Sequence, residues 1–194
     1  MTNLKPLNRG DVPELESFFE GVESRLSFLT NSMLTMAHKP ELVKTLVPML
    51  VAVFGPGTVS QKIKQLAGFG VSHQAGSQYC VAHMTHGAVH AGISKDKIES
   101  FCEMAPPDLS PAEQAVLTVA RGAAQSPNAV SAKDFAMLRD HFDDTQIVEI
   151  IAVIAMMGFF NRWNDTMATQ LEQPAIETVT GVLPEDGWSI GKHG

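Results

Sequence analysis

Cysteine is scarce in this chain: only two of its 194 residues are cysteines, Cys80 and Cys102. Neither belongs to a C-x-x-C pair or to a four-ligand spacing, so we expect no structural zinc site and no disulfide scaffold. A thiol outside such arrangements is either a reactive group or a small buried residue. The surroundings of these two sulfur atoms therefore decide which of these two roles each cysteine has.

Positive charge and long apolar runs are also limited. The chain has 14 Lys and Arg against 21 Asp and Glu, with no basic cluster, so we expect no nucleic-acid partner. The longest apolar run, 150–160, is too short to span a bilayer. The N-terminal residues lack the apolar core of a secretion signal. These features predict a cytoplasmic protein that binds no membrane.

What the sequence does contain is helical periodicity. Apolar residues are 44% of the chain, enough for a large core, and they recur at spacings of three and four, as in 11–29. No segment alternates with period two, so we predict an all-α fold, a single-domain helical bundle. The expected helices are 11–29, 30–37, 41–53, 58–73, 77–91, 94–102, 110–124, 131–141 and 145–171.

Local signals refine these boundaries. The residues Ser110-Pro111-Ala112-Glu113 form the clearest helix start, with an N-cap, a proline at N1 and a glutamate at N3. Pro48 predicts a kink or break, Pro106-Pro107 a joint, and Pro174 the end of the last helix. We therefore expect a helical domain over 1–174 and an irregular tail over 175–194 that packs on this domain or on a neighbouring subunit.

The segment around Cys80 carries the strongest chemical signal. If Ser77 is the N-cap of a helix, Cys80 is residue N3 and its sulfur lies near free backbone N–H groups, which favour a thiolate. His83 follows one turn later, about 60° around the helix. This arrangement predicts a thiol of low pKa that attacks a peroxide, with His83 protonating the leaving group. The plainer alternative is a buried cysteine beside a hydrogen-bonded histidine.

Other histidines and Cys102 suggest less specific roles. His86 and His90 continue the stripe begun by His83, but three ligands on one straight helix rarely converge, because seven residues rise about 10 Å. We expect no metal and no other cofactor. Cys102 can resolve an oxidised Cys80 only if the fold brings the two within disulfide reach, and a core position is the favoured interpretation. His38 and His73 could line the same pocket as Cys80.

Four segments together resemble a known family. They are Asn31-Ser32-Met33-Leu34 with 36–42, Tyr79-Cys80-Val81-Ala82-His83, Leu109-Ser110-Pro111-Ala112-Glu113, and 159–165, which reads FFNRWND. In order and spacing they are similar to the alkylhydroperoxidase D-like, or carboxymuconolactone decarboxylase, superfamily, and most of all to its peroxidase-related branch. The resemblance implies an all-helical fold and a homo-oligomer, either a dimer, a trimer or a hexamer.

The resemblance also shows where this chain departs from the family pattern. In the hydroperoxidase members a glutamate precedes the first cysteine of a C-x-x-C pair by twelve residues, and a histidine follows the second cysteine by four. Here Cys80 occupies the second cysteine position, while Ser77, Gln65 and Met84 occupy the others. Serine cannot form a disulfide, and neither glutamine nor methionine can relay protons.

Three functions remain open at this point. The first is a one-cysteine peroxidase, an oxidoreductase in which Cys80 reduces a hydroperoxide, His83 assists, Gln65 and Ser77 hold the peroxide, and an external thiol regenerates the enzyme. The second is a cofactor-free decarboxylase or isomerase of a small organic acid. The third is a degenerate oligomer that binds a ligand without turnover.

Overall fold

The computed structural model describes residues 2–103 and 108–194. The joint predicted at Pro106-Pro107 lies outside this part. The described residues form ten α-helices and three short 3-10 helices, with no strand, which confirms the all-α prediction. The α-helices are α1 (Glu16–Leu26), α2 (Asn31–Met36), α3 (Pro40–Phe54), α4 (Gln61–Gln74), α5 (Gln78–His90), α6 (Lys95–Ser100), α7 (Pro111–Ala124), α8 (Ala132–Arg139), α9 (Asp144–Met167) and α10 (Gln173–Val182).

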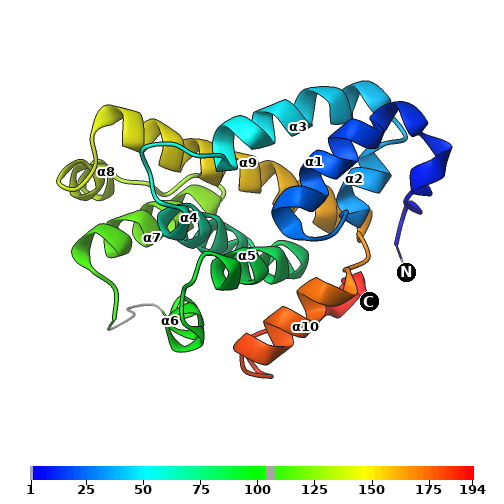
Figure 1. Cartoon of the computed structure of the whole chain (residues 1–194). Helices are drawn as coiled ribbons and strands as arrows, with labels where there is room; N and C mark the ends of the chain where they lie inside the picture. The colour runs from blue at the N-terminus through cyan, green and yellow to red at the C-terminus, as the bar shows by residue number, and fades with distance from the viewer. Residues whose placement is uncertain (1, 104–107) are drawn as a thin grey trace.

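Helices α4 and α5 form the centre of the bundle (Figure 1). Helix α4 packs against α5, α7 and α9, and α5 packs in addition against α9 and α10. Helices α1, α2 and α3 lie together beyond one end of this pair, where α3 also contacts α9. The buried residues of α4, α5 and α9 form the core, and the cysteine-bearing helix α5 is therefore enclosed on several sides.

Most predicted caps are present in the structure. The hydroxyl of Thr30 accepts from Met33 N–H, and Ser110 and Glu113 form the expected capping box. One predicted cap was wrong, and one predicted break is absent. Helix α4 is capped by Ser60, because the Thr58 hydroxyl donates instead to Glu149. Helix α3 continues through Pro48 without a break.

The C-terminal segment differs most from its prediction. The last long helix ends at Met167, where Ala168 adopts a left-handed conformation, and Pro174 lies in the first turn of a further helix, α10, instead of ending one. Proline suits a first helical turn because the N–H it lacks would be unpaired there. Helix α10 packs on α5, and Trp188 Nε1 donates to the Gln78 carbonyl at 3.0 Å, so much of the predicted irregular tail is an ordered part of the bundle.

Helix α9 is long and apolar enough to cross a membrane by length and composition alone. One such helix is weak evidence, because the core helix of a bundle passes the same test. Its contacts with α3, α4, α5 and α7 are those of a core helix.

Candidate functional site

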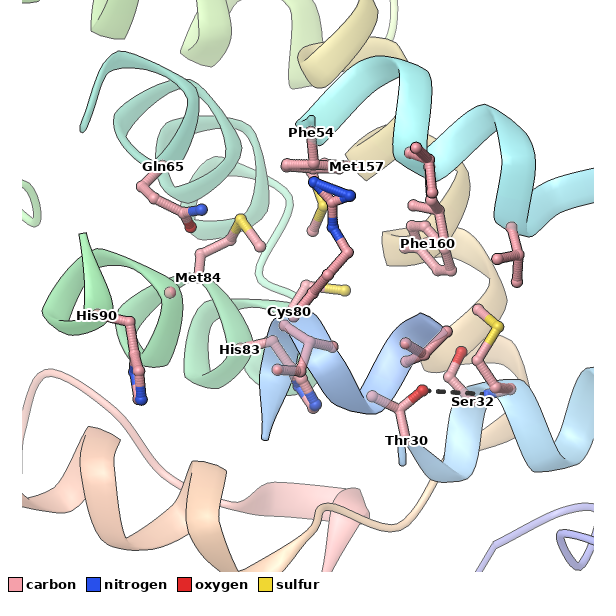
Figure 2. A pocket seen from close by; sticks show the side chains of 18 of the residues that line it. Thr30, Ser32, Phe54, Gln65, Cys80, His83, Met84, His90, Met157 and Phe160 are labelled. Carbon is pink, nitrogen blue, oxygen red and sulfur yellow. Dashed lines mark hydrogen bonds between the residues drawn. The ribbon is translucent and has the colours of Figure 1, made fainter. Parts of the chain in front are cut away.

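A cavity of about 450 Å³ opens beside Cys80, lined by residues of α1, α2, α3, α4, α5 and α9 (Figure 2). We call it the Cys80 cavity. Its wall is mainly apolar, and Cys80 is the only cysteine among the residues that line it. Its apolar lining includes Met33, Leu50, Phe54, Met84, Met157 and Phe160. A cavity of this size and character suits a small hydrophobic molecule.

Cys80 occupies the predicted place in its helix, but its thiol is not activated as the sequence suggested. Ser77 is the N-cap of α5, so Cys80 is residue N3. Burial, however, raises the pKa of the thiol to about 12, and the charges of Asp165 and Glu172 act in the same direction. The Ser77 hydroxyl and the Asn164 amide, whose Nδ2 lies 3.7 Å from the sulfur, lower it only in part. The prediction of a low thiol pKa is therefore wrong for the empty cavity, because desolvation outweighs the helix terminus.

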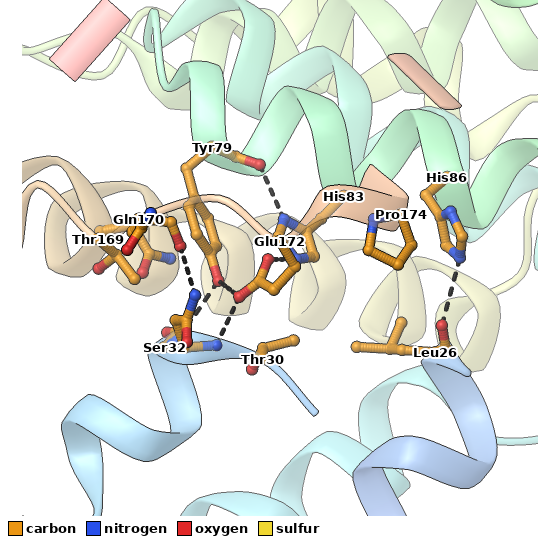
Figure 3. A network of polar contacts seen from close by, with 12 residues as sticks. Leu26, Thr30, Ser32, Tyr79, His83, His86, Thr169, Gln170, Glu172 and Pro174 are labelled. Carbon is orange, nitrogen blue, oxygen red and sulfur yellow. Dashed lines mark hydrogen bonds and ion pairs between the residues drawn. The ribbon is translucent and has the colours of Figure 1, made fainter. Parts of the chain in front are cut away.

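His83 belongs to a buried polar network on the cavity wall (Figure 3). Its Nε2 lies 3.0 Å from Glu172 Oε2, and its Nδ1 lies 2.9 Å from the Tyr79 carbonyl. Glu172 also accepts from the Tyr79 hydroxyl at 2.8 Å and from the Asn31 N–H. Both ring nitrogens of His83 thus face acceptors, which a doubly protonated imidazole satisfies.

The pKa shifts agree with this arrangement. Burial lowers the pKa of His83, but the charge of Glu172 and the bonds to Glu172 and Tyr79 raise it more, so the net direction is upward. For Glu172, burial alone would raise the pKa. The charge of His83 and the hydrogen bonds from His83, Asn31 and Tyr79 lower it by more than burial raises it, so the net direction is downward. The proton therefore resides on His83, and the pair is an imidazolium and a carboxylate.

The other predicted site residues divide into two groups. Gln65 and Met84 line the Cys80 cavity, as Figure 2 shows. Ser77 does not line it: this fully buried side chain donates to Asp165 instead. Four buried polar atoms of cavity-lining residues have no hydrogen-bond partner, namely Ser32 Oγ, Gln65 Oε1, Asn164 Oδ1 and His83 Nε2, whose contact with Glu172 is an ion pair. These atoms can pair with a polar group of a bound molecule.

The remaining candidates lie apart from this arrangement. Cys80 and Cys102 are both free thiols, and burial raises the pKa of Cys102 to about 11. His38 is exposed and bonds the Lys5 carbonyl, and His73 stacks on Phe69, so neither lines the cavity.

The histidine stripe does not form a metal site. His86 bonds Thr178 and the Leu26 carbonyl, and His90 bonds the His86 carbonyl. Across residues 2–103 and 108–194, no group of three His, Cys, Asp or Glu side chains is placed to hold a metal.

Sequence reasoning missed Asn164 and Glu172 as site residues. Asn164 lies within the segment 159–165 that resembles the family, and its position on the buried side of a strongly apolar helix was the available signal. Glu172 is the N-cap of α10, two residues before Pro174. Nothing in the sequence pairs Glu172 with His83, because 89 positions separate them and the pairing depends on the packing of α10 against α5.

Comparison with known proteins identifies the family to which this chain belongs. The family model for carboxymuconolactone decarboxylases matches residues 40–122. The solved debrominase Bmp8 is 30% identical, with 94% of this chain and 98% of the debrominase covered and a TM-score of 0.86. This protein belongs to the alkylhydroperoxidase D-like, or carboxymuconolactone decarboxylase, superfamily. The resemblance found in the sequence is thereby confirmed.

Two more distant members of this superfamily share its fold. A peroxidase-related protein from Ralstonia eutropha JMP134 is 20% identical, covering 95% of this chain and 98% of its own, with a TM-score of 0.78. One from Silicibacter sp. TM1040 is 18% identical, covering 89% and 92%, with a TM-score of 0.71. A search of the curated proteins finds no match. The debrominase has been solved both alone and, as a cysteine-to-alanine variant, with 2,3,4-tribromopyrrole.

Proposed function

We propose that this protein is a cofactor-free, thiol-dependent reductase in which Cys80 removes a halogen from a small halogenated aromatic ring. The observation that carries the proposal is the position of Cys80 as the one cysteine on the wall of a mostly apolar cavity. The similarity to the debrominase, over nearly the full length of both chains, supports a halogenated substrate.

The chemistry proceeds through the sulfur of Cys80. The sulfur attacks the bromine of the ring, the carbon–bromine bond breaks, and a sulfur–bromine bond forms, so that the sulfur is oxidised by two electrons and the carbon is reduced. An external thiol then displaces bromide to give a mixed disulfide, and a second thiol releases Cys80 and a disulfide. The sum is one aryl bromide and two thiols converted to one arene, one hydrogen bromide and one disulfide.

His83 is the residue we assign to protonating the ring carbon. Among the cavity-lining groups it is a buried imidazolium, held charged by Glu172. At that step His83 gives its Nε2 proton, which faces Glu172 in the empty cavity, to the ring carbon. Water then reprotonates Nε2, and the ion pair with Glu172 forms again. This role makes His83 a proton donor, as expected from the sequence, although its pairing with Glu172 was not.

A second candidate is the reduction of a bulky organic hydroperoxide by the same sulfur. There the oxygen–oxygen bond breaks, an alcohol leaves, and Cys80 becomes a sulfenic acid, which the same two thiols reduce with release of water. The apolar wall favours an organic hydroperoxide over hydrogen peroxide, which has no apolar surface to bury.

Bromide release from 2,3,4-tribromopyrrole in the presence of glutathione tests the proposal. We expect steady release by the wild type and a loss of at least about 10³-fold in Cys80→Ser. The matched control is Cys102→Ser, which removes the other thiol and keeps wild-type activity. Equal bromide release by Cys80→Ser would contradict the proposal, because the sulfur of Cys80 would then not take part in the reaction. Stabilisation by ligands without any turnover would favour a non-catalytic binding protein.

A further inference from the structure

The Cys80 cavity is longer than a single brominated ring requires. Its lining includes residues of α5 at spacings of three and four from Tyr79 to Ala91, so the cavity follows this helix along its whole length. Figure 2 shows Cys80, Met84 and His90 in a row along that face. From Cys80 to His90 the helix rises about 15 Å, at about 1.5 Å per residue. A five-membered ring with its bromines covers only part of this length, so the cavity accommodates a longer molecule.

The two ends of the cavity differ in their exposure to water. At the Cys80 end the wall is closed, since Cys80, Ser32 and Asn164 are only 2%, 3% and 1% exposed. Several other lining residues are exposed, namely Arg25, Val51, Pro56, Gln61 and His90. Water therefore enters the cavity beside these residues, and we call this end the mouth.

The mouth lies far from Cys80 along the bundle. Helices α4 and α5 follow one another through a short turn and pack together, so the first turn of α4, with Gln61, lies beside the last turn of α5, with His90. The Gln61 amide donates to the Phe54 carbonyl at 2.9 Å, which brings the end of α3 to the same place. A molecule that reaches Cys80 from the mouth therefore has to extend along α5.

Arg25 brings a cationic group to the mouth from the last turn of α1. Its Nη2 lies 3.6 Å from the position that a Cβ on Gly55 would take, so the guanidinium reaches the end of α3. Gln61 contacts the same glycine through a hydrogen bond to its carbonyl. Within residues 2–103 and 108–194, the guanidinium of Arg25 makes no ion pair and no hydrogen bond. Its donors are available to a bound molecule.

The charges of the lining favour an anion. Among the described residues that line the cavity are Arg25, His83 and His90, but no Asp or Glu. This differs from the chain as a whole, in which 21 Asp and Glu exceed 14 Lys and Arg. The charge of His83 is paired with Glu172, whereas that of Arg25 has no such partner. A guanidinium presents two parallel N–H groups that match a carboxylate.

We propose that the substrate is a halogenated aromatic acid, whose carboxylate binds Arg25 at the mouth while its ring lies against Cys80 at the closed end. The inference rests on the proposed function and names its substrate class. Apolar side chains such as Met84 line the cavity between the two ends and suit a short hydrocarbon arm between ring and carboxylate. Because the mouth is open to water, the carboxylate keeps part of its hydration, which avoids the cost of burying an anion.

Calorimetric titration of Cys80→Ser, which lacks the reactive sulfur, tests the subsite without turnover. The probes are hydroxyphenylpropanoate brominated at both ring positions next to its hydroxyl, and the neutral amide of the same acid. We expect the acid to bind about tenfold more tightly than the amide, and Arg25→Gln to abolish this preference. Arg25→Lys should keep part of it, because the ammonium retains the charge without the paired donors.

Arg162→Gln is the matched control, since Arg162 is an exposed arginine that does not line the Cys80 cavity, and it should keep the full preference. Equal binding of acid and amide, or a preference that survives in Arg25→Gln, would overturn the proposal.

Turnover distinguishes the two molecules that could supply a carboxylate, because glutathione carries carboxylates as well. With Cys80 present, Arg25→Gln should raise KM for the brominated acid by about tenfold. A rise in KM for glutathione in its place would overturn the proposal and assign Arg25 to the reductant. Because calorimetry needs no reaction, a preference that depends on Arg25 but occurs without bromide release would reject the proposed function and keep the carboxylate subsite.

Discussion

At the scale of single residues, the unusual property of Cys80 is its resistance to ionisation. The N-terminal turn of α5, the Ser77 hydroxyl and the hydrogen bond from Asn164 favour the thiolate, but burial and two nearby carboxylates oppose it and prevail. We expect ultraviolet titration of Cys102→Ser to show no thiolate below about pH 10. A titration midpoint near the ordinary cysteine value would contradict this account of the empty cavity.

The pair formed by His83 and Glu172 gives a prediction about stability. Glu172→Gln leaves a charged histidine without its partner in the interior, so we expect a loss of about 3 kcal/mol in the free energy of unfolding. Urea unfolding measures this loss. Glu177→Gln, an exposed change on the same helix, is the control and should have little effect.

The pH dependence of this loss follows from the directions of the two shifts. The contribution of Glu172, whose pKa is lowered from 4.5, is complete above that value and is lost as the pH falls through its folded pKa. The contribution of His83, whose pKa is raised from 6.5, is complete below that value and is lost as the pH rises through its folded pKa. The difference between wild type and Glu172→Gln should be largest between these two values, and a constant difference would contradict the assignment.

At the scale of elements, the junction of α3, α4 and α9 depends on a buried lysine. Lys64 of α4 is fully buried, and its Nζ donates to the Val53 and Gly55 carbonyls at 2.9 and 2.8 Å and lies 3.2 Å from Glu149. It thereby satisfies carbonyls at the end of α3, near the rim of the Cys80 cavity.

Replacing this lysine should loosen the junction. We expect Lys64→Ala to reduce the free energy of unfolding by about 3 kcal/mol, because it leaves buried carbonyls and Glu149 without their donor. Lys62→Ala, an exposed change on the same helix, is the control. Equal midpoints of urea unfolding for the two variants would show that Lys64 does not hold the junction.

At this same scale, the helices and the thiol pKa differ in how well the sequence predicts them. Helices with strong caps, such as the one beginning at Ser110, were predictable because the signal is local. Helix α10 was missed because Pro174 can end a helix or begin one, and only contact with α5 decides which. The low thiol pKa was wrongly predicted for a related reason: the helix terminus is visible in the sequence, whereas the burial that outweighs it is not.

At the scale of the whole molecule, the association state stays a prediction. The family resemblance implies a homo-oligomer, and α9 exposes apolar side chains at Val148 and Phe159. Apolar side chains exposed in this way are often covered by a partner. We expect light scattering to give a dimer, trimer or hexamer, and a monomer across the accessible concentration range would contradict the prediction.

The proposed function depends on Cys80 being the group that reacts in the apolar cavity. A single-turnover experiment tests this most directly: the protein is mixed with excess 2,3,4-tribromopyrrole without any thiol, and the debrominated product is counted per subunit. We predict about one product per subunit, with oxidation confined to Cys80, and none from Cys80→Ser. Repeated turnover without thiol, or an unchanged yield from Cys80→Ser, would contradict the account.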